Sequence, residues 1–96
     1  MARNHHFHLD QGQHSIAVNV GPGRHGGIEL LVDGKVIAYR REHGKGTTVL
    51  SGELPDGPAR RFVVRVHQPH LVRMKPGCTL ELDGVERPMP ERYAAF

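Results

Sequence analysis

Two Asp-Gly pairs, each lying between runs of alternating apolar residues, constrain the fold of this chain more than any other feature. They are Asp33-Gly34 and Asp83-Gly84. A two-residue hairpin turn of type I′ needs positive φ at both central positions, and Asp-Gly tolerates this better than most pairs. The sequence therefore predicts two antiparallel hairpins. The four flanking runs are 28–32, 35–41, 78–82 and 85–87.

The first turn also predicts a register for its hairpin. Placing Val32 opposite Lys35 sets Leu30 opposite Ile37 and Ile28 opposite Tyr39. Tyr39 is then expected to face inward, and both faces of the hairpin carry apolar residues. Because a strand that is apolar on both faces is usually covered on both, this hairpin is predicted to be central.

Three further segments alternate with the period of a strand, namely 14–20, 47–54 and 61–67. In 14–20, Ile16, Val18 and Val20 are expected to share the inner face, and in 61–67 the inner residues are Phe62, Val64 and Val66. Segment 69–74 is either a short strand or an extended edge, because Pro69 cannot donate within a ladder.

No segment has a sustained helical period, and 96 residues suffice for one modest core. We therefore predict a single all-β domain, a small antiparallel β-sandwich or partly closed barrel of about seven to eight short strands. Segments 1–13 and 88–96 are the candidates for loose termini, and the tail either docks through Tyr93 and Phe96 or stays loose.

The composition narrows the class of protein. The formal net charge is +3, and the one cysteine, Cys78, cannot form an internal disulfide. A reducing compartment is the simpler assumption. The N-terminal residues contain no apolar signal-peptide core and no apolar run is long enough to cross a bilayer, so a cytoplasmic protein with no membrane partner is expected.

Histidines near the N-terminus form the most suggestive motif. His6, His8 and Asp10 read H-x-H-x-D, and in a strand they would project to one face, where they could hold a divalent metal with His14 as a fourth ligand. Metal-dependent hydrolases with the H-x-H-x-D motif have another histidine immediately after the aspartate, where this chain has Gln11. They also need a much larger domain than 96 residues can form. A polar first strand with adventitious metal binding is the alternative interpretation.

Other motifs argue against catalysis. "GPGRHG" (21–26) fits G-x-G-x-x-G, but a strand follows it instead of the helix that would hold a pyrophosphate. Nothing near Cys78 would lower the pKa of its thiol, which is more typical of a small core residue. His67 and His70 have no cysteine pair and no glutamate beside them in the sequence, so they are expected at the surface. The sequence predicts no enzyme and no cofactor.

Arginines supply one candidate binding surface. Arg40, Arg41, Arg61 and Arg65 would form a basic strip if strands 35–41 and 61–67 were neighbours. Sheets that read nucleic acids also expose aromatic side chains for stacking, and this chain has only five aromatic residues. A solvated basic face is therefore favoured, and nucleic-acid binding is the weaker alternative.

Segments 14–35 and 78–86 resemble the domain of Fas apoptosis inhibitory molecule proteins. The likeness covers about a third of the chain and lies in hairpin and turn positions, although this chain lacks the tryptophans common in that family. The resemblance implies a β-sandwich that interacts with or protects other proteins and has no cofactor. The matching residues are His14, Ile16, Val32, Asp33, Gly34, Lys35, Thr79, Leu80, Glu81 and Gly84.

These observations together favour a non-catalytic β-sandwich that binds a protein partner or itself, because strand edges can pair with other chains. A histidine-based sensor of metal or ligand is the alternative from a different class. The basic nucleic-acid-binding module is a third hypothesis.

Overall fold

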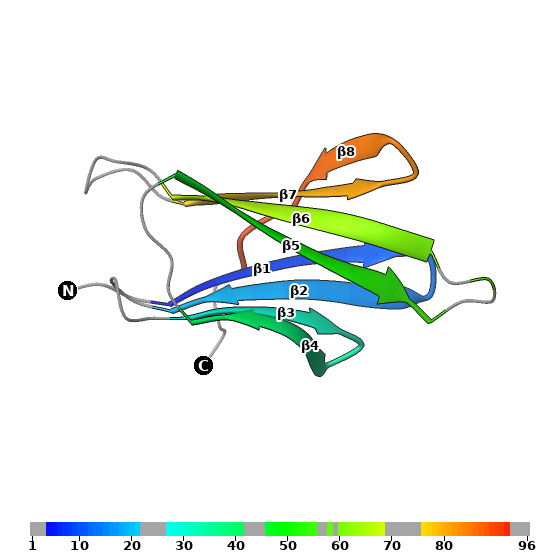
Figure 1. Ribbon diagram of the computed structural model, residues 1–96, viewed down its shortest axis with the longest axis horizontal. Coiled ribbons are helices and arrows are strands. Elements are labelled where there is room, and N and C mark those ends of the chain that lie inside the picture. The colour runs from blue at the N-terminus through cyan, green and yellow to red at the C-terminus, as the bar shows by residue number, and fades with distance from the viewer. Residues whose placement is uncertain are drawn as a thin grey trace.

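The protein is an all-β structure of eight antiparallel strands in two four-stranded sheets. The computed structural model describes residues 4–21, 27–41, 46–55, 58, 60–68 and 76–92. Sheet A has the order β1-β2-β3-β4 and sheet B the order β5-β6-β7-β8, so both are simple meanders that stack as two layers (Figure 1). The strands are β1 (His5–Gln11), β2 (His14–Val20), β3 (Ile28–Val32), β4 (Lys35–Arg40), β5 (Gly46–Leu54), β6 (Arg60–Gln68), β7 (Gly77–Leu82) and β8 (Val85–Pro88). The predicted fold class is confirmed.

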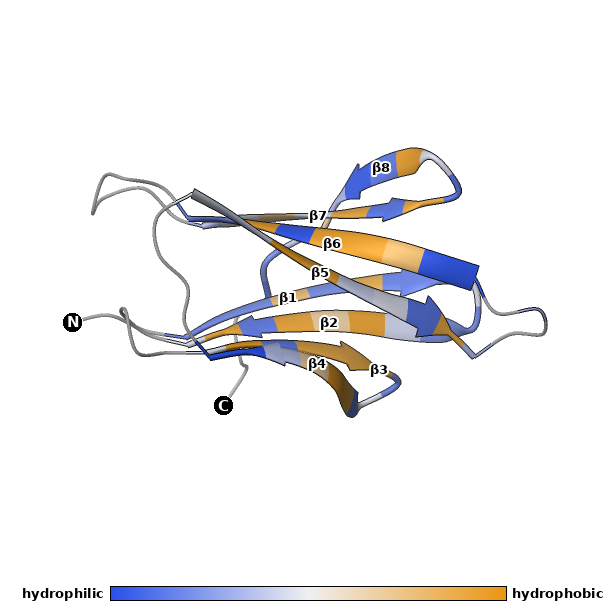
Figure 2. Ribbon diagram, viewed as in Figure 1, coloured by the Kyte–Doolittle hydropathy of each residue, from blue (hydrophilic) through white to orange (hydrophobic). Residues whose placement is uncertain are grey.

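The core lies between the two sheets and is built by alternation along each strand (Figure 2). Ile16, Val18 and Val20 of β2 are buried, as predicted. Phe62, Val64 and Val66 are their counterparts on β6. Among the described residues no polar or charged residue is buried, so apolar burial accounts for the packing between the layers. The described residues contain no helix that could cross a bilayer.

Both Asp-Gly turns adopt the predicted backbone. The φ angles are 51° at Asp33 and 83° at Gly34, and 53° at Asp83 and 76° at Gly84. Positive φ at both central positions is the type I′ requirement. The two turns join β3 to β4 and β7 to β8.

The register of the first hairpin differs from the prediction after its first two pairs. Val32 lies opposite Lys35, but a bulge follows, and Leu30 then lies opposite Ala38 and Ile28 opposite Arg40. The extra residue belongs to β4, where Ile37 packs toward sheet B: a Cβ atom placed on Gly52 of β5 would lie 2.4 Å from Ile37 Cδ1. Packing between the sheets, which is not local in sequence, therefore sets this register.

The predicted central position of this hairpin is wrong for β4, which is an edge strand of sheet A. Tyr39, expected inward, is 56% exposed. Its ring lies so close over Gly27 that a Cβ atom there would be 2.3 Å from the tyrosine hydroxyl oxygen. The apolar residues on both faces of β4 thus do not reflect burial on both faces.

The described parts of both terminal segments, the candidates for loose termini, pair with the sandwich. β1 pairs with β2 along its whole length. Residues 89–92, which we call the C-terminal strap, leave sheet B after β8 and reach β1 of sheet A (Figure 1). Segment 69–74 and the proposed docking residues Tyr93 and Phe96 lie outside the described residues.

Hydrogen bonds fix the strap at both sheets. Met89 N–H donates to Cys78 O of β7 at 2.8 Å, and its side chain is buried in the core. His8 N–H donates to Pro90 O at 3.1 Å, and Arg92 N–H donates to His6 O at 2.6 Å. The strap thereby covers the outer edge of β1 and joins the ends of the fold.

Candidate functional site

The histidines of the H-x-H-x-D motif lie on β1, where the alternation places His6, His8 and Asp10 on the outer face of sheet A. Their ring atoms are engaged by neighbouring side chains. His6 Nδ1 donates to Asn19 Oδ1, and Asn19 Nδ2 donates to Glu29 Oε1 at 3.2 Å. The shared face was therefore predicted correctly, but His6 belongs to a polar row across three strands.

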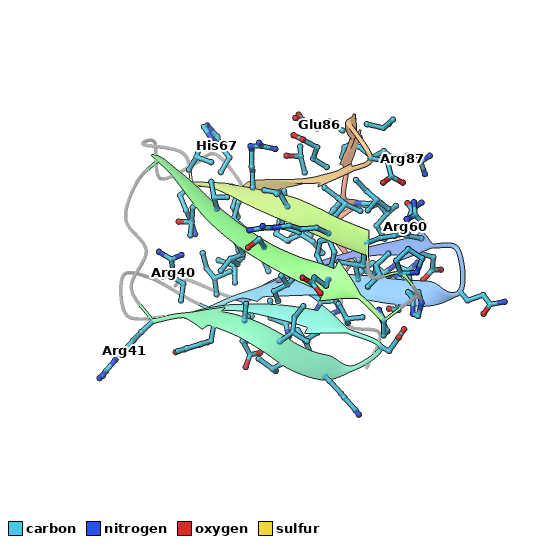
Figure 3. The ribbon with its side chains drawn as sticks, turned by 45° about the vertical axis from the view of Figure 1, so that its right-hand side comes forward. Arg40, Arg41, Arg60, His67, Glu86 and Arg87 are labelled. Carbon is cyan, nitrogen blue, oxygen red and sulfur yellow. The ribbon has the colours of Figure 1, made fainter. Side chains whose placement is uncertain are left out.

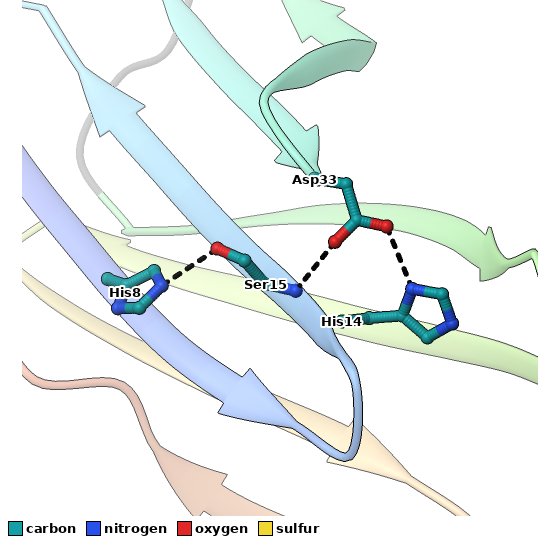
Figure 4. Close-up of polar contacts among 4 residues, drawn as sticks. All are labelled: His8, His14, Ser15 and Asp33. Atoms are coloured by element: carbon teal, nitrogen blue, oxygen red, sulfur yellow. Dashed lines mark hydrogen bonds and ion pairs between the residues drawn. The ribbon is translucent and has the colours of Figure 1, made fainter.

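His8 contacts two polar residues on the outer face of sheet A. Its Nε2 lies 2.8 Å from Ser15 Oγ (Figure 4). The same nitrogen lies 3.1 Å from Asp10 Oδ1. His8 Nδ1 is buried and has no hydrogen-bond partner within the described part of the chain, so no carboxylate orients the ring from that side.

His14 starts β2 and belongs to a different polar cluster, centred on the first Asp-Gly turn. Its Nδ1 donates to Asp33 Oδ2 at 2.8 Å, while the other carboxylate oxygen accepts the Ser15 backbone N–H at 2.9 Å (Figure 4). These two bonds, the backbone bond first, lower the pKa of the Asp33 carboxyl. No group of three or more potential metal-ligating side chains occurs among the described residues.

The Asp33 contacts predict a pH-dependent contribution to folding stability. Since the folded-state pKa of Asp33 lies below its ordinary value of 3.8, the stabilisation is complete above that value and is lost as the pH falls through the folded-state pKa. We expect Asp33→Ala to lower the urea midpoint at pH 6 more than Asp83→Ala does. Both changes put alanine at positive φ in the same turn type. Asp83→Ala also removes the exposed ion pair of Asp83 with Arg60, so any excess effect of Asp33→Ala belongs to the contacts of Asp33 with His14 and Ser15.

The excess effect of Asp33→Ala over Asp83→Ala is expected to shrink between pH 4 and pH 2.5. An excess that stayed constant over this range would show that the carboxylate contacts of Asp33 do not stabilise the fold. The measurement is a series of urea unfolding curves for the two variants and the unaltered chain.

The arginines of the hypothetical basic strip are divided between the two sheets. Arg40 and Arg41 lie at the end of β4 (Figure 3). Arg61 and Arg65 lie on β6 of sheet B, so the condition that these strands be neighbours in one sheet is not met. Arg65 Nη1 is 2.9 Å from Glu81 Oε1, which leaves its charge largely compensated. The four arginines therefore do not lie on neighbouring strands of one sheet, which is the arrangement that the predicted strip required.

Cys78 is buried at the start of β7, as expected for a core residue. Burial raises the pKa of its thiol to about 12. A thiol with that pKa is almost entirely protonated at neutral pH and is a poor nucleophile. Cys78 Sγ lies 3.5 Å from Sδ of the Met89 thioether, to which the thiol can donate.

A surface that the sequence did not reveal lies where β4 and β5 run along the same side of the sandwich (Figure 1). We call it the apolar margin. It comprises four exposed residues: Val36 at 51%, Ile37 at 43%, Tyr39 at 56% and Val49 at 49%. By their registers Val36 and Tyr39 lie toward the outer face of sheet A and Val49 toward that of sheet B, and Ile37 lies between the two edges. The fifth large hydrophobic that is exposed in the described chain is Val85, on β8. Val49 shares one face of β5 with the polar residues Thr47 and Ser51, and this pattern in the sequence could have indicated its exposure. The exposure of β4 could not be predicted in this way, because it depends on the order of the strands in the sheet.

The four edge strands differ in how well they are protected against pairing with another chain. The strap covers β1, the bulge interrupts β4, and β8 has four residues and ends at Pro88. β5 has nine residues, pairs with β6 without interruption, contains no proline and carries one charged residue, Glu53. Bulges, prolines, charges and short length are the usual protections of an edge, so β5 is the least protected of the four.

Comparisons of the chain with models of protein families, with curated proteins and with solved structures gave no match.

Proposed function

We propose that this β-sandwich is a non-catalytic domain that binds a protein partner through the apolar margin. The observation that carries the proposal is that four of the five large hydrophobics exposed in the described chain lie on β4 and β5, the edge strands of the two sheets that contact each other on one side of the sandwich. Exposed apolar side chains that gather on one side of a small domain commonly mark an interaction surface. Scattered exposure would carry no such meaning.

The chemistry of the margin fits a protein partner. Tyr39 offers a large ring with a polar end, and aromatic residues are enriched where proteins meet. Exposed Lys35, Arg40 and Arg41 lie beside the apolar residues and supply a polar rim. The resemblance to Fas apoptosis inhibitory molecule proteins implies a function of the same class and remains an expectation.

Site-specific photo-crosslinking in cells would test this proposal. A photoreactive phenylalanine analogue would replace Tyr39 in one variant and Val85 in the other, since these residues are similarly exposed, at 56% and 53%. We expect protein adducts from position 39 and few from position 85. Adducts to a second copy or to another protein would both support the proposal, whereas equal yields from both positions, or none from position 39, would refute it.

A further inference from the structure

Alternate residues of β5 point their backbone N–H and C=O groups to its free edge, the side that faces away from β6, where no other strand of the described chain pairs with them. Met89 N–H donates to Cys78 O, so the backbone groups of Cys78 face β8 and not β6. In an antiparallel ladder, the backbone N–H and C=O groups of two opposite residues either both point toward each other or both point away from each other. Val66, the partner of Cys78, therefore faces β5, and its own partner Thr48 faces β6.

Backbone groups alternate along a strand, so the residues next to Thr48 point to the free edge. An independent contact agrees: Arg40 Nη2 donates to Val49 O at 3.3 Å. This is the one hydrogen bond from a side chain to that edge among the described residues. The residues facing the free edge are thus Thr47, Val49, Ser51 and Glu53.

We infer that the partner at this edge is a second copy of the chain, whose β5 adds antiparallel to the first. This inference rests on the proposed function and specifies its partner. A two-fold axis at Leu50 is the one placement that sets every edge-facing residue of one copy opposite an edge-facing residue of the other. It sets Val49 opposite Ser51 and Thr47 opposite Glu53 of the second copy. The two β-sheets B then form one eight-stranded sheet, and the symmetric contact closes without further growth.

The side chains are compatible with this pairing. Glu53 is the one charged residue of β5, and in this register it meets the uncharged Thr47 of the second copy. The Thr47 hydroxyl lies 2.9 Å from His67 Nδ1, so the carboxylate approaches a polar pair and no like charge. Arg40 is exposed and holds Val49 O through one bond, so it can leave the edge as the second strand arrives.

Sedimentation analysis of the full chain would test the dimer. We expect dimer to increase between about 1 μM and 1 mM, the range of a small interface. Ser51→Pro should weaken the dimer at least about tenfold, because it removes an edge N–H that no β6 residue uses and puts a ring in its place. Ser51→Ala keeps the N–H and serves as the matched control. Circular dichroism would show whether each variant is folded.

Cysteine cross-linking would test the register without relying on a proline variant. In the inferred pairing, Val49→Cys of one copy lies opposite Ser51→Cys of the other, at a separation that a disulfide can bridge. A mixture of the two single variants should form a mixed disulfide under mild oxidation, whereas each variant alone should not. Cys78 is buried and can remain in both.

A chain that stays monomeric at 1 mM would overturn the inference, as would equal cross-linking of each single variant alone. Either result would leave the proposed function intact if Tyr39 still captured a different protein. Loss of all adducts at position 39 would remove the proposed function as well.

Discussion

Removing the C-terminal strap is expected to cost a large part of the stability of this domain. A chain ending at Pro88 loses the Met89 side chain from the core, two backbone hydrogen bonds to β1 and the ion pair between His5 Nδ1 and Glu91 Oε2 at 2.5 Å. Burying a methionine contributes about 2–3 kcal/mol and each backbone bond about 1 kcal/mol. We expect the free energy of unfolding to fall by about 3–5 kcal/mol, out of about 5–14 kcal/mol for a domain of this size.

Urea unfolding of two truncated chains would measure this loss. A chain ending at Arg92 retains the strap and is the matched control, so the difference between the two belongs to residues 89–92. Met89→Ala in the full chain should cost about 2–4 kcal/mol on its own, since it leaves a cavity between the sheets. Equal midpoints for the two truncated chains would contradict the view that the strap holds the sandwich together.

The strap also shows where prediction from the sequence ends. Pro88 and Pro90 favour the end of a strand, and β8 ends at Pro88. They say nothing about where the chain goes next, because the pairing of Phe7 with Glu91 joins residues from opposite ends of the chain. Contacts of that kind leave no periodic signal in either segment.

Local rules predicted the strands and turns well, since both depend on neighbouring residues. β2 has the predicted bounds 14–20, and the Asp-Gly turns have the predicted dihedral angles. Strand order and bulges depend on distant contacts, such as that of Ile37 with Gly52. The exposed position of Tyr39 could not be predicted because an apolar strand looks the same whether it is central or an exposed binding edge.

The candidate sites show the same contrast between features set by neighbouring residues and features set by distant contacts. The shared outer face of His6, His8 and Asp10 was predictable from the period of a strand. That His14 instead contacts Asp33 follows from the pairing of β2 with β3, which brings the start of β2 beside the turn after Val32. A ligand set proposed from spacing alone could not anticipate this pairing.

Cys78 provides a chemical probe of the core beneath the C-terminal strap. Its reaction with iodoacetamide is expected to be very slow in the folded protein. Burial raises its pKa from 9.0 to about 12, a difference of 3 (12 − 9.0). At pH 8 the thiolate fraction is therefore about a thousandfold smaller than in the unfolded chain, and the thiolate is the reactive species. The rate in native buffer should be lower than the rate in guanidinium by at least that factor.

Met89→Ala should increase the native reaction rate of Cys78, because the Met89 thioether lies against the thiol and Met89 N–H bonds to the Cys78 carbonyl. If alkylation requires opening of the fold, a loss of about 2–4 kcal/mol corresponds to a rate increase of about thirtyfold to a thousandfold. Val85→Ala, which alters an exposed residue on the same sheet, should leave the rate nearly unchanged. A native rate within tenfold of the unfolded rate would mean that Cys78 is accessible and that the strap does not close this end of the core.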